Sequence, residues 1–285
     1  MEWQHRQILS QPGRPASFQQ RRLENPIAKT KVALIKPLFS FMRNKILAAN
    51  WKMNLTQTEV SQWLQDTAKY NWQAPGKELR VYPSAIYLQQ MMSFVHVGAQ
   101  NFYFQDNGAF TGEISLSQLK SIGVSSVLVG HSERRELFAE NNLMIAQKVR
   151  ACVQHDLPFI LCCGETLNIR NENLHLTFIQ TQLQAALEAF SSDHLHLLSI
   201  AYEPIWAIGS GLAASQEQIT EMHTEIRKIL EERFGVGGQD IPILYGGSVS
   251  PANAKEIFSC PHVGGALVGG ASLDPQVFNQ LWEQL

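Results

Sequence analysis

Short apolar runs recur along the chain from residue 42 onward, and longer stretches separate them. The runs are Ile46–Ala49, Leu79–Tyr82, Val95–Gly98, Val127–Gly130, Phe159–Cys163, Ser199–Tyr202, Ile243–Tyr245 and Ala266–Gly269. Each run is short and apolar at both odd and even positions, which is the pattern of a strand buried on both faces. The runs therefore predict eight buried strands.

The stretches between the strands show helical periodicity. Apolar residues fall on one stripe in Gln57–Tyr70, Leu137–His155 and Ile219–Phe234. Ser215, with Gln218 three residues later, is expected to cap the last of these helices, and further helices are expected to start at Pro251 and Asp274. Strands that alternate with helices are typical of parallel βαβ units.

Two architectures fit this alternation, a closed (β/α)₈ barrel and an open doubly wound sheet. The 244 residues from Met42 to the C-terminus are close to the typical barrel length of about 250 residues. The dinucleotide fingerprint Gly-x-Gly-x-x-Gly, which often marks the open sheet, follows none of the candidate strands. We therefore predict an α/β fold in which residues 42–285 form a single closed (β/α)₈ TIM barrel.

Residues 1–41 differ in composition from the rest of the chain. They hold seven basic and two acidic side chains, a net charge of +5, which leaves −7 for the other 244 residues within a total of −2. The segment lacks the central apolar run and the cleavage site of a secretory signal, and its Arg-rich composition only weakly resembles a transit peptide. We interpret it as an irregular basic extension, either a leader or the product of an upstream start codon with Met42 as the functional beginning.

Composition excludes several classes of protein. With 45% hydrophobic and 17% charged residues the chain is not intrinsically disordered, and its net charge of −2 gives no global field toward nucleic acid or anionic lipid. No run of about 18 apolar residues is present, so we expect no membrane span. The cysteines (Cys152, Cys162, Cys163 and Cys260) have no Cys-x-x-Cys spacing. Buried free thiols in a reducing cytoplasm are the favoured interpretation.

Polar residues that could do chemistry follow several strands immediately. The segments are Asn50–Lys52 after the first strand, Gly130–Arg135 after the fourth, Cys163–Glu165 at the end of the fifth and Tyr202–Pro204 at the end of the sixth. In a parallel barrel these positions meet at the rim formed by the carboxyl ends of the strands, where barrel enzymes build their active sites. The sequence therefore predicts an active site at this rim.

Five motifs make the prediction more specific. Asn50–Asn54, Val129–Arg135, Ala201–Gly209, Tyr245–Ser248 and Leu267–Leu273 closely resemble the triosephosphate isomerase family, in order and over nearly the whole chain apart from residues 1–41. The resemblance implies an isomerase that interconverts dihydroxyacetone phosphate and D-glyceraldehyde 3-phosphate by proton transfer through an enediolate, in glycolysis and gluconeogenesis. It implies no cofactor and no metal.

The resemblance also implies roles for four catalytic residues. Glu203 would be the base that removes a carbon-bound proton, and His131 the electrophile, with its imidazole kept neutral by the helix N-terminus that follows it. Lys52 would supply fixed positive charge, and Asn50 would orient the reacting oxygens beside it. Glu133 would anchor a nearby basic side chain, with Lys52 as the candidate.

The substrate phosphate needs backbone N–H groups and a positive dipole end. By the same resemblance Gly209, Ser248, Gly269 and Gly270 would provide them, together with Asn50 and Lys52. The segment Pro204–Ala213 resembles the family's mobile lid. The lid would close over the bound phosphate and protect the intermediate from elimination.

The segment Gln100–Glu113 is rich in aromatic residues and glycine. A monomer is not expected to expose so many aromatic side chains on one loop. The segment resembles the family's dimerisation loop, which would bring Thr111 close to Asn50 and Lys52 of a second copy. We therefore expect a homodimer; the alternative is a loop that packs on itself.

Two other functions remain as alternatives. The first is another sugar-phosphate isomerase or lyase on the same barrel, because a fold alone does not determine chemistry. The second is a non-catalytic protein that binds a phosphate ligand. The presence of Glu203, His131 and Lys52 together favours the isomerase over both.

Overall fold

A computed structural model of the protein describes residues 44–94, 96–208 and 213–285, so the predicted extension 1–41 lies outside the described residues. The strands are β1 (Lys45–Asn50), β2 (Lys77–Tyr82), β3 (His96–Ala99), β4 (Ser126–Val129), β5 (Phe159–Glu165), β6 (Leu198–Pro204), β7 (Ile243–Tyr245) and β8 (Gly265–Val268). The α-helices are α1 (Gln57–Thr67), α2 (Leu88–Met91), α3 (Leu116–Ser121), α4 (Ser132–Leu137), α5 (Asn142–Gln154), α6 (Leu167–Asn171), α7 (His175–Leu187), α8 (Gln216–Phe234), α9 (Ala254–Ser259) and α10 (Pro275–Gln284). Short 3₁₀ helices span Ala85–Tyr87, Ser192–Leu197, Ile205–Ala207, Gly235–Asp240 and Gly270–Ser272.

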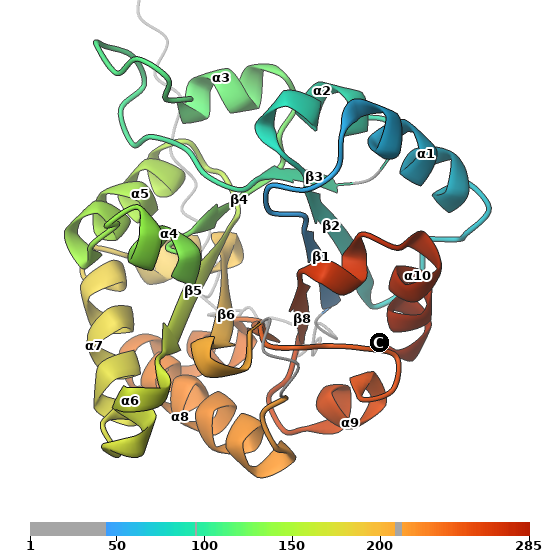
Figure 1. Ribbon diagram of the computed structural model, residues 1–285. Coiled ribbons are helices and arrows are strands. Elements are labelled where there is room, and N and C mark those ends of the chain that lie inside the picture. Colours follow the sequence, from blue (N-terminus) through green and yellow to red (C-terminus); the bar gives the residue numbers. More distant parts are fainter. Residues whose placement is uncertain (1–43, 95, 209–212) are drawn as a thin grey trace, which may run out of the picture. The chain divides into compact units, whose positions relative to one another are not determined.

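The strands close into a parallel barrel in sequence order. Each strand pairs with the next one along the chain, and β1 pairs with β8, where Ile46 lies opposite Gly265. Figure 1 shows the α-helices arranged as a ring around the strands. The predicted single (β/α)₈ barrel is therefore confirmed for the described residues.

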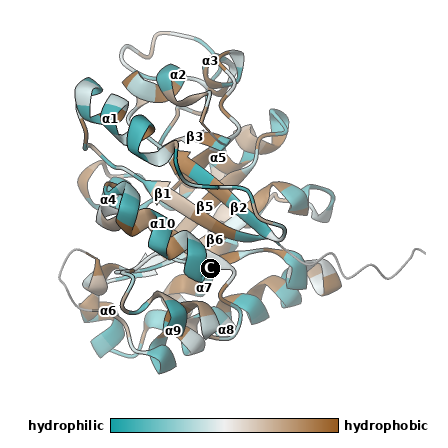
Figure 2. Cartoon of the chain, turned by 90° about the vertical axis from the view of Figure 1, so that its right-hand side faces the viewer, coloured by the Kyte–Doolittle hydropathy of each residue, from teal (hydrophilic) through white to brown (hydrophobic). Residues whose placement is uncertain are grey.

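Two apolar layers hold the barrel together. Side chains that point inward fill its interior, among them Ile46, Leu128, Ile160 and Leu267, while the outward-pointing strand residues pack against the helices. Figure 2 accordingly shows hydrophobic colours along the strands and hydrophilic colours on parts of the outer helices such as α10. The pattern explains why the strands are apolar on both faces.

The helix predicted over Leu137–His155 is wrong in its first part. Helix α4 ends at Leu137, and α5 begins only at Asn142. Ala139 has a left-handed backbone (φ 55°), which interrupts the helical path, and the side chain of Asn141 accepts a hydrogen bond from the N–H of Met144 at 3.0 Å. The connection therefore ends one helix and caps the next.

The other predicted helix starts have mixed outcomes. Ser215 and Gln218 form the expected capping box of α8, and Asp274 caps α10. The predicted start at Pro251 is three residues too early, since α9 begins at Ala254. The side chain of Asn253 accepts a hydrogen bond from the N–H of Ser250 at 2.8 Å, which holds the intervening residues in a turn.

Two expectations from composition can be compared with the structure. All four cysteines are free and buried, as predicted. Among the described residues, no helix is both long enough and apolar enough to cross a membrane.

One large side chain inside the barrel depends on a glycine opposite it. Tyr82 of β2 is fully buried, and its hydroxyl lies 2.9 Å from Oγ of Ser126 on β4. A Cβ atom added to Gly98 of β3 would lie 2.2 Å from Cε1 of Tyr82. The ring therefore occupies the space that a larger residue at position 98 would need.

We expect Gly98→Ala to destabilise the barrel by about 1–3 kcal/mol, because the added methyl group overpacks a closed interior. Urea unfolding followed by circular dichroism measures this change in the free energy of unfolding. Gly270→Ala is the matched control, since a Cβ at Gly270 would meet no atom within 4 Å. An unchanged stability of Gly98→Ala would contradict the packing described for Tyr82.

Candidate active site

The carboxyl ends of the strands surround a cavity of about 330 Å³ at the barrel rim. Its lining brings together most of the residues predicted from the sequence, namely Asn50, Lys52, His131, Glu203, Ser248, Gly269 and Gly270. These residues come from the ends of β1, β4, β6, β7 and β8 or from the loops that follow them. The predicted convergence of strand ends is therefore observed for these residues.

Glu203 lies near the end of β6 and is only 1% exposed. Its Oε1 lies 3.0 Å from Nε2 of His131, and its Oε2 accepts a hydrogen bond from the N–H of Ser132 at 2.9 Å. Burial raises the pKa of the Glu203 carboxyl. His131 and Ser132 together lower this pKa by more than burial raises it, so it lies below its ordinary value. The side chain is therefore an ionised carboxylate at neutral pH.

Glycines on the neighbouring strands make room for Glu203. A Cβ atom added to Gly246, just after β7, would lie 2.9 Å from Cγ of Glu203. One added to Gly164 of β5 would lie 1.9 Å from the backbone oxygen of Glu203. Both positions require a residue without a side chain.

His131 caps the N-terminus of α4, where the N–H of Glu133 donates to Nδ1 at 3.3 Å. Burial lowers the pKa of the imidazole, but the carboxylates of Glu203 and Glu133 together raise it by more, so the pKa lies above its ordinary value. This differs from the expected lowering, because the carboxylate lies directly on Nε2. The Glu133 N–H favours a ring whose Nδ1 carries no proton, and this contact does not depend on the position of Glu203.

Lys52 follows β1 and has a left-handed backbone, with φ 53°. Its Nζ lies 2.6 Å from Oε1 of Glu133, the contact expected for that glutamate. Asn50 is buried, and its Oδ1 accepts a hydrogen bond from the backbone N–H of Lys52 at 3.1 Å. The lysine is thus fixed both at its backbone and at its ammonium group.

The first residues of the lid segment Pro204–Ala213 are hydrogen-bonded to β5. Trp206 donates its Nε1–H to Oε1 of Glu165 at 3.0 Å, and the Tyr202 hydroxyl donates to the same oxygen at 2.9 Å. Gly209, predicted to bind phosphate, lies outside the described residues.

The aromatic segment Gln100–Glu113 extends away from the ring of helices between β3 and α3 (Figure 1). The ring of Tyr103 lies 4.4 Å from that of Phe104 and 4.5 Å from that of Phe110, so the segment partly packs on itself. Phe110 nevertheless remains 40% exposed, and Thr111 at the loop end is exposed. Thr111 does not line the rim cavity of its own chain.

Several residues of the site were not predicted from the sequence. Ser132 holds Glu203 through its backbone N–H, and Gly246 and Gly247 line the cavity. The position of Ser132 directly after His131, and that of the two glycines directly before Ser248, are the signals that could have indicated them.

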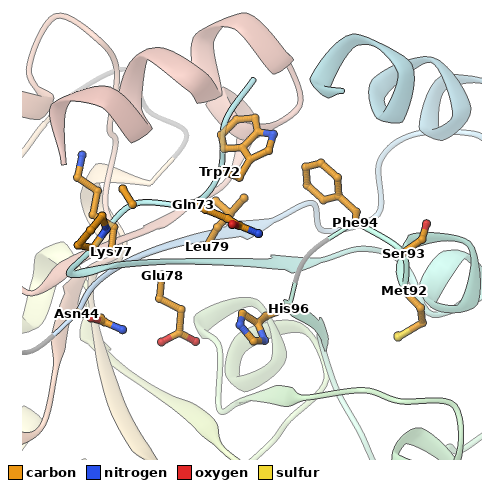
Figure 3. Close-up of a pocket in the computed structure, with 12 residues that line it drawn as sticks. Asn44, Trp72, Gln73, Lys77, Glu78, Leu79, Met92, Ser93, Phe94 and His96 are labelled. Atoms are coloured by element: carbon orange, nitrogen blue, oxygen red, sulfur yellow. The ribbon is translucent and has the colours of Figure 1, made fainter. Parts of the chain in front are cut away.

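A larger cavity of about 970 Å³ lies at the opposite end of the strands, around the beginnings of β2 and β3. Figure 3 shows its lining, with Trp72 and Phe94 beside Lys77, Glu78 and His96. It contains none of the predicted catalytic residues. Because parallel barrels carry their chemistry at the other rim, size alone does not make this cavity the active site.

The closed barrel and the rim cavity with its carboxylate, imidazole and lysine define the class of the protein, a (β/α)₈-barrel enzyme. A family model described as triosephosphate isomerase matches residues 45–285. The chain therefore belongs to the triosephosphate isomerase family.

Individual relatives agree with the family match over nearly their whole length. The triosephosphate isomerase of Cytophaga hutchinsonii is 42% identical over 244 residues, which cover 83% of this chain and 97% of that protein. That of Thermodesulfovibrio yellowstonii is 40% identical over 84% of this chain and 99% of its own length. That of Amoebophilus asiaticus is 42% identical over 86% of this chain and its full length.

Proposed function

We propose that the protein interconverts dihydroxyacetone phosphate and D-glyceraldehyde 3-phosphate, with Glu203 as the base. The observation that carries this proposal is the rim cavity, which places an ionised buried carboxylate beside an imidazole and a lysine. A proton on a carbon next to a carbonyl needs a base that is both close and shielded from water. Glu203 is shielded from water, and it lines the cavity that would hold the substrate.

The reaction moves one proton between two neighbouring carbons of the substrate. Glu203 takes a proton from C1 of dihydroxyacetone phosphate, and the electron pair of the broken C–H bond moves into the carbonyl to give an enediolate. The hydroxyl proton on O1 moves to O2 by way of Nε2 of His131, which lines the same cavity. The carboxyl of Glu203 returns a proton to C2, and the electron pair of the O1–H bond forms the aldehyde carbonyl, which gives D-glyceraldehyde 3-phosphate. To reach the substrate, the carboxylate has to leave the contacts with His131 and Ser132 that it makes in this structure.

His131 donates to the oxygens that become negative in the enediolate. The carboxylate of Glu203 is the largest influence that raises the pKa of this imidazole. When Glu203 turns toward the substrate, the Glu133 carboxylate still raises the pKa of the ring, with its Oε2 3.7 Å from Nδ1. Burial, which is the largest single influence on this pKa, and the Lys52 charge lower it, and the Glu133 N–H also favours the neutral ring. The imidazole then acts as a neutral donor, while Lys52 supplies positive charge and Asn50 orients the oxygens.

The phosphate is held mainly by backbone groups. Gly269 and Gly270 follow β8, a common place for phosphate sites in barrels, and Ser248 follows β7 on the same side of the cavity. Gly270 also begins a short 3₁₀ helix, Gly270–Ser272. With Lys52 beside Gly269, these groups offer donors and positive charge to a phosphate dianion, and Gly209 of the lid is assigned the same role.

The active form is assigned to a homodimer in which Thr111 of each chain approaches Asn50 and Lys52 of the other. Exposed Met53 and Phe138 line a cavity of about 190 Å³ beside these residues, and such apolar side chains suit burial by a partner. We expect sedimentation equilibrium to give about 64 kDa, twice the chain mass of 32.0 kDa. A species of single-chain mass at micromolar concentration, with full activity, would contradict this assembly.

The reaction is the triose phosphate step of glycolysis and gluconeogenesis, as membership of the family implies. Free buried cysteines suit a reducing compartment, and we assign the protein to the cytoplasm.

A coupled assay with purified protein and each triose phosphate tests the proposed function. We expect turnover in both directions without added metal or cofactor. The absence of turnover with intact phosphate binding would favour a binding protein, and turnover of a different sugar phosphate would favour another isomerase or lyase.

A further inference from the structure

The backbone of Lys52 is strained, and the residue type does not account for its left-handed conformation. A left-handed conformation is unfavourable for a residue with a Cβ atom and persists only where the surroundings enforce it. Lys52 has φ 53° and is neither glycine nor asparagine. Because the side chain projects from this backbone, a change in the backbone would displace the ammonium group that faces the rim cavity.

Two side chains from the segments that follow β2 and β3 hold the carbonyl group of Lys52. The hydroxyl of Ser84, in the loop after β2, donates to the Lys52 oxygen at 3.1 Å. The amide Nε2 of Gln100, directly after β3, donates to the same oxygen at 2.8 Å. With Asn50 accepting from the Lys52 N–H, both polar backbone groups of this residue are bonded to side chains.

Gln100 connects two strand ends through one amide group. Its Nε2 also donates to the backbone oxygen of Tyr82 at 2.9 Å, so both amide hydrogens are used. Two carbonyl acceptors require an NH₂ group at this position, and a carboxylate of the same shape would be repelled by both. The glutamine side chain therefore joins the end of β2 to the strained residue after β1.

We propose that Ser84 and Gln100 are positioning residues that hold Lys52 in its left-handed conformation and thereby place its ammonium group for catalysis. Neither side chain lines the rim cavity. Gln100 does line the neighbouring cavity of about 190 Å³ with Asn50 and Lys52, but both of its amide hydrogens are directed to backbone oxygens, so we assign it to the Lys52 carbonyl and not to the substrate. The proposal rests on the proposed function of Lys52 in the isomerase reaction.

Single substitutions with matched controls test the proposal. We expect Ser84→Ala to lower kcat/KM by about threefold to tenfold, which is the effect expected from the loss of one hydrogen bond. Ser84→Thr keeps a hydroxyl group and should retain most of the wild-type kcat/KM. Gln100→Glu is expected to lower kcat/KM by about tenfold to 100-fold, because it removes two donors and adds a charge. The controls Ser125→Ala and Gln90→Glu remove similar half-buried hydrogen bonds, to the Val97 oxygen and to the Ser61 hydroxyl, and should stay within about twofold of wild type.

A double-mutant cycle separates positioning of Lys52 from a general structural role. In a Lys52→Ala background, Ser84→Ala and Gln100→Glu should cause no further loss of kcat/KM, because the group they position is gone. If Ser84→Ala or Gln100→Glu lowered kcat/KM as much in the Lys52→Ala protein as in the wild type, the proposal would be overturned. Wild-type kcat/KM in the two single variants would also overturn it.

Calorimetry of inorganic phosphate binding to each variant gives a second test that does not depend on turnover. We expect weaker phosphate binding in Ser84→Ala and Gln100→Glu than in their controls. A wild-type protein without isomerase activity would refute the proposed function, whereas equal phosphate affinity in all variants would refute the positioning role.

Discussion

We expect Glu203→Gln to lower kcat for triose phosphate isomerisation by about 1,000-fold or more, because a neutral amide cannot accept the carbon-bound proton. The amide has nearly the same shape as the carboxyl group, and its oxygen can still accept the hydrogen bond from the N–H of Ser132, so we expect the fold to be retained. Steady-state kinetics in both directions, with circular dichroism of the same sample, measure both expectations. The effect should appear in kcat more than in KM, since Glu203 is not assigned to hold the phosphate.

Two further variants define how specific this loss is. Glu203→Asp keeps the charge but withdraws the carboxylate by one methylene group, and we expect a loss of about 100-fold or more from the misplaced base. Glu256→Gln removes an exposed carboxylate from α9 and should leave kcat unchanged. Normal turnover by Glu203→Gln would show that another group is the base.

The second large effect is expected from Lys52→Met, which should lower kcat/KM by about 100-fold to 1,000-fold. Methionine has a similar length but no charge, so the enediolate and the phosphate both lose an electrostatic partner. The barrel residues 42–285 carry a net charge of −7, and attraction of a phosphate dianion therefore depends on local groups at the rim. Kinetics together with calorimetry of inorganic phosphate binding measure the two losses separately.

Lys69→Met is the matched control for this variant, because Lys69 is an exposed lysine just after α1. It changes the net charge equally but is expected to leave kcat/KM within about twofold of wild type. An equal loss in both variants would assign the effect to overall charge and not to the position of Lys52.

The strands and the fold class could be predicted from the sequence for a physical reason. Barrel strands are buried on both faces, so short runs such as Phe159–Cys163 are visible as uninterrupted apolar segments. The break between α4 and α5 could not be predicted in the same way. It depends on the left-handed backbone of Ala139 and the capping side chain of Asn141, which leave little trace in apolar periodicity.

The candidate site shows the same division. Residues at strand ends, such as Lys52 and Glu203, were predictable because parallel strands bring their ends to one rim. The raised pKa of His131 could not be predicted from the sequence, because it depends on the direction in which the Glu203 side chain turns. The contacts of Ser84 and Gln100 with Lys52 join residues 32 and 48 positions apart, and no local pattern reports such contacts.

In the proposed reaction, Glu203 moves a proton between C1 and C2 of the substrate through an enediolate. Nuclear magnetic resonance of dihydroxyacetone phosphate incubated with the protein in deuterated water tests this proton transfer directly, because a proton held by a carboxyl group can exchange with solvent. We predict deuterium at C2 of the D-glyceraldehyde 3-phosphate formed and at C1 of the recovered substrate, and loss of both signals with Glu203→Gln. Full turnover with no deuterium at either carbon would contradict the account.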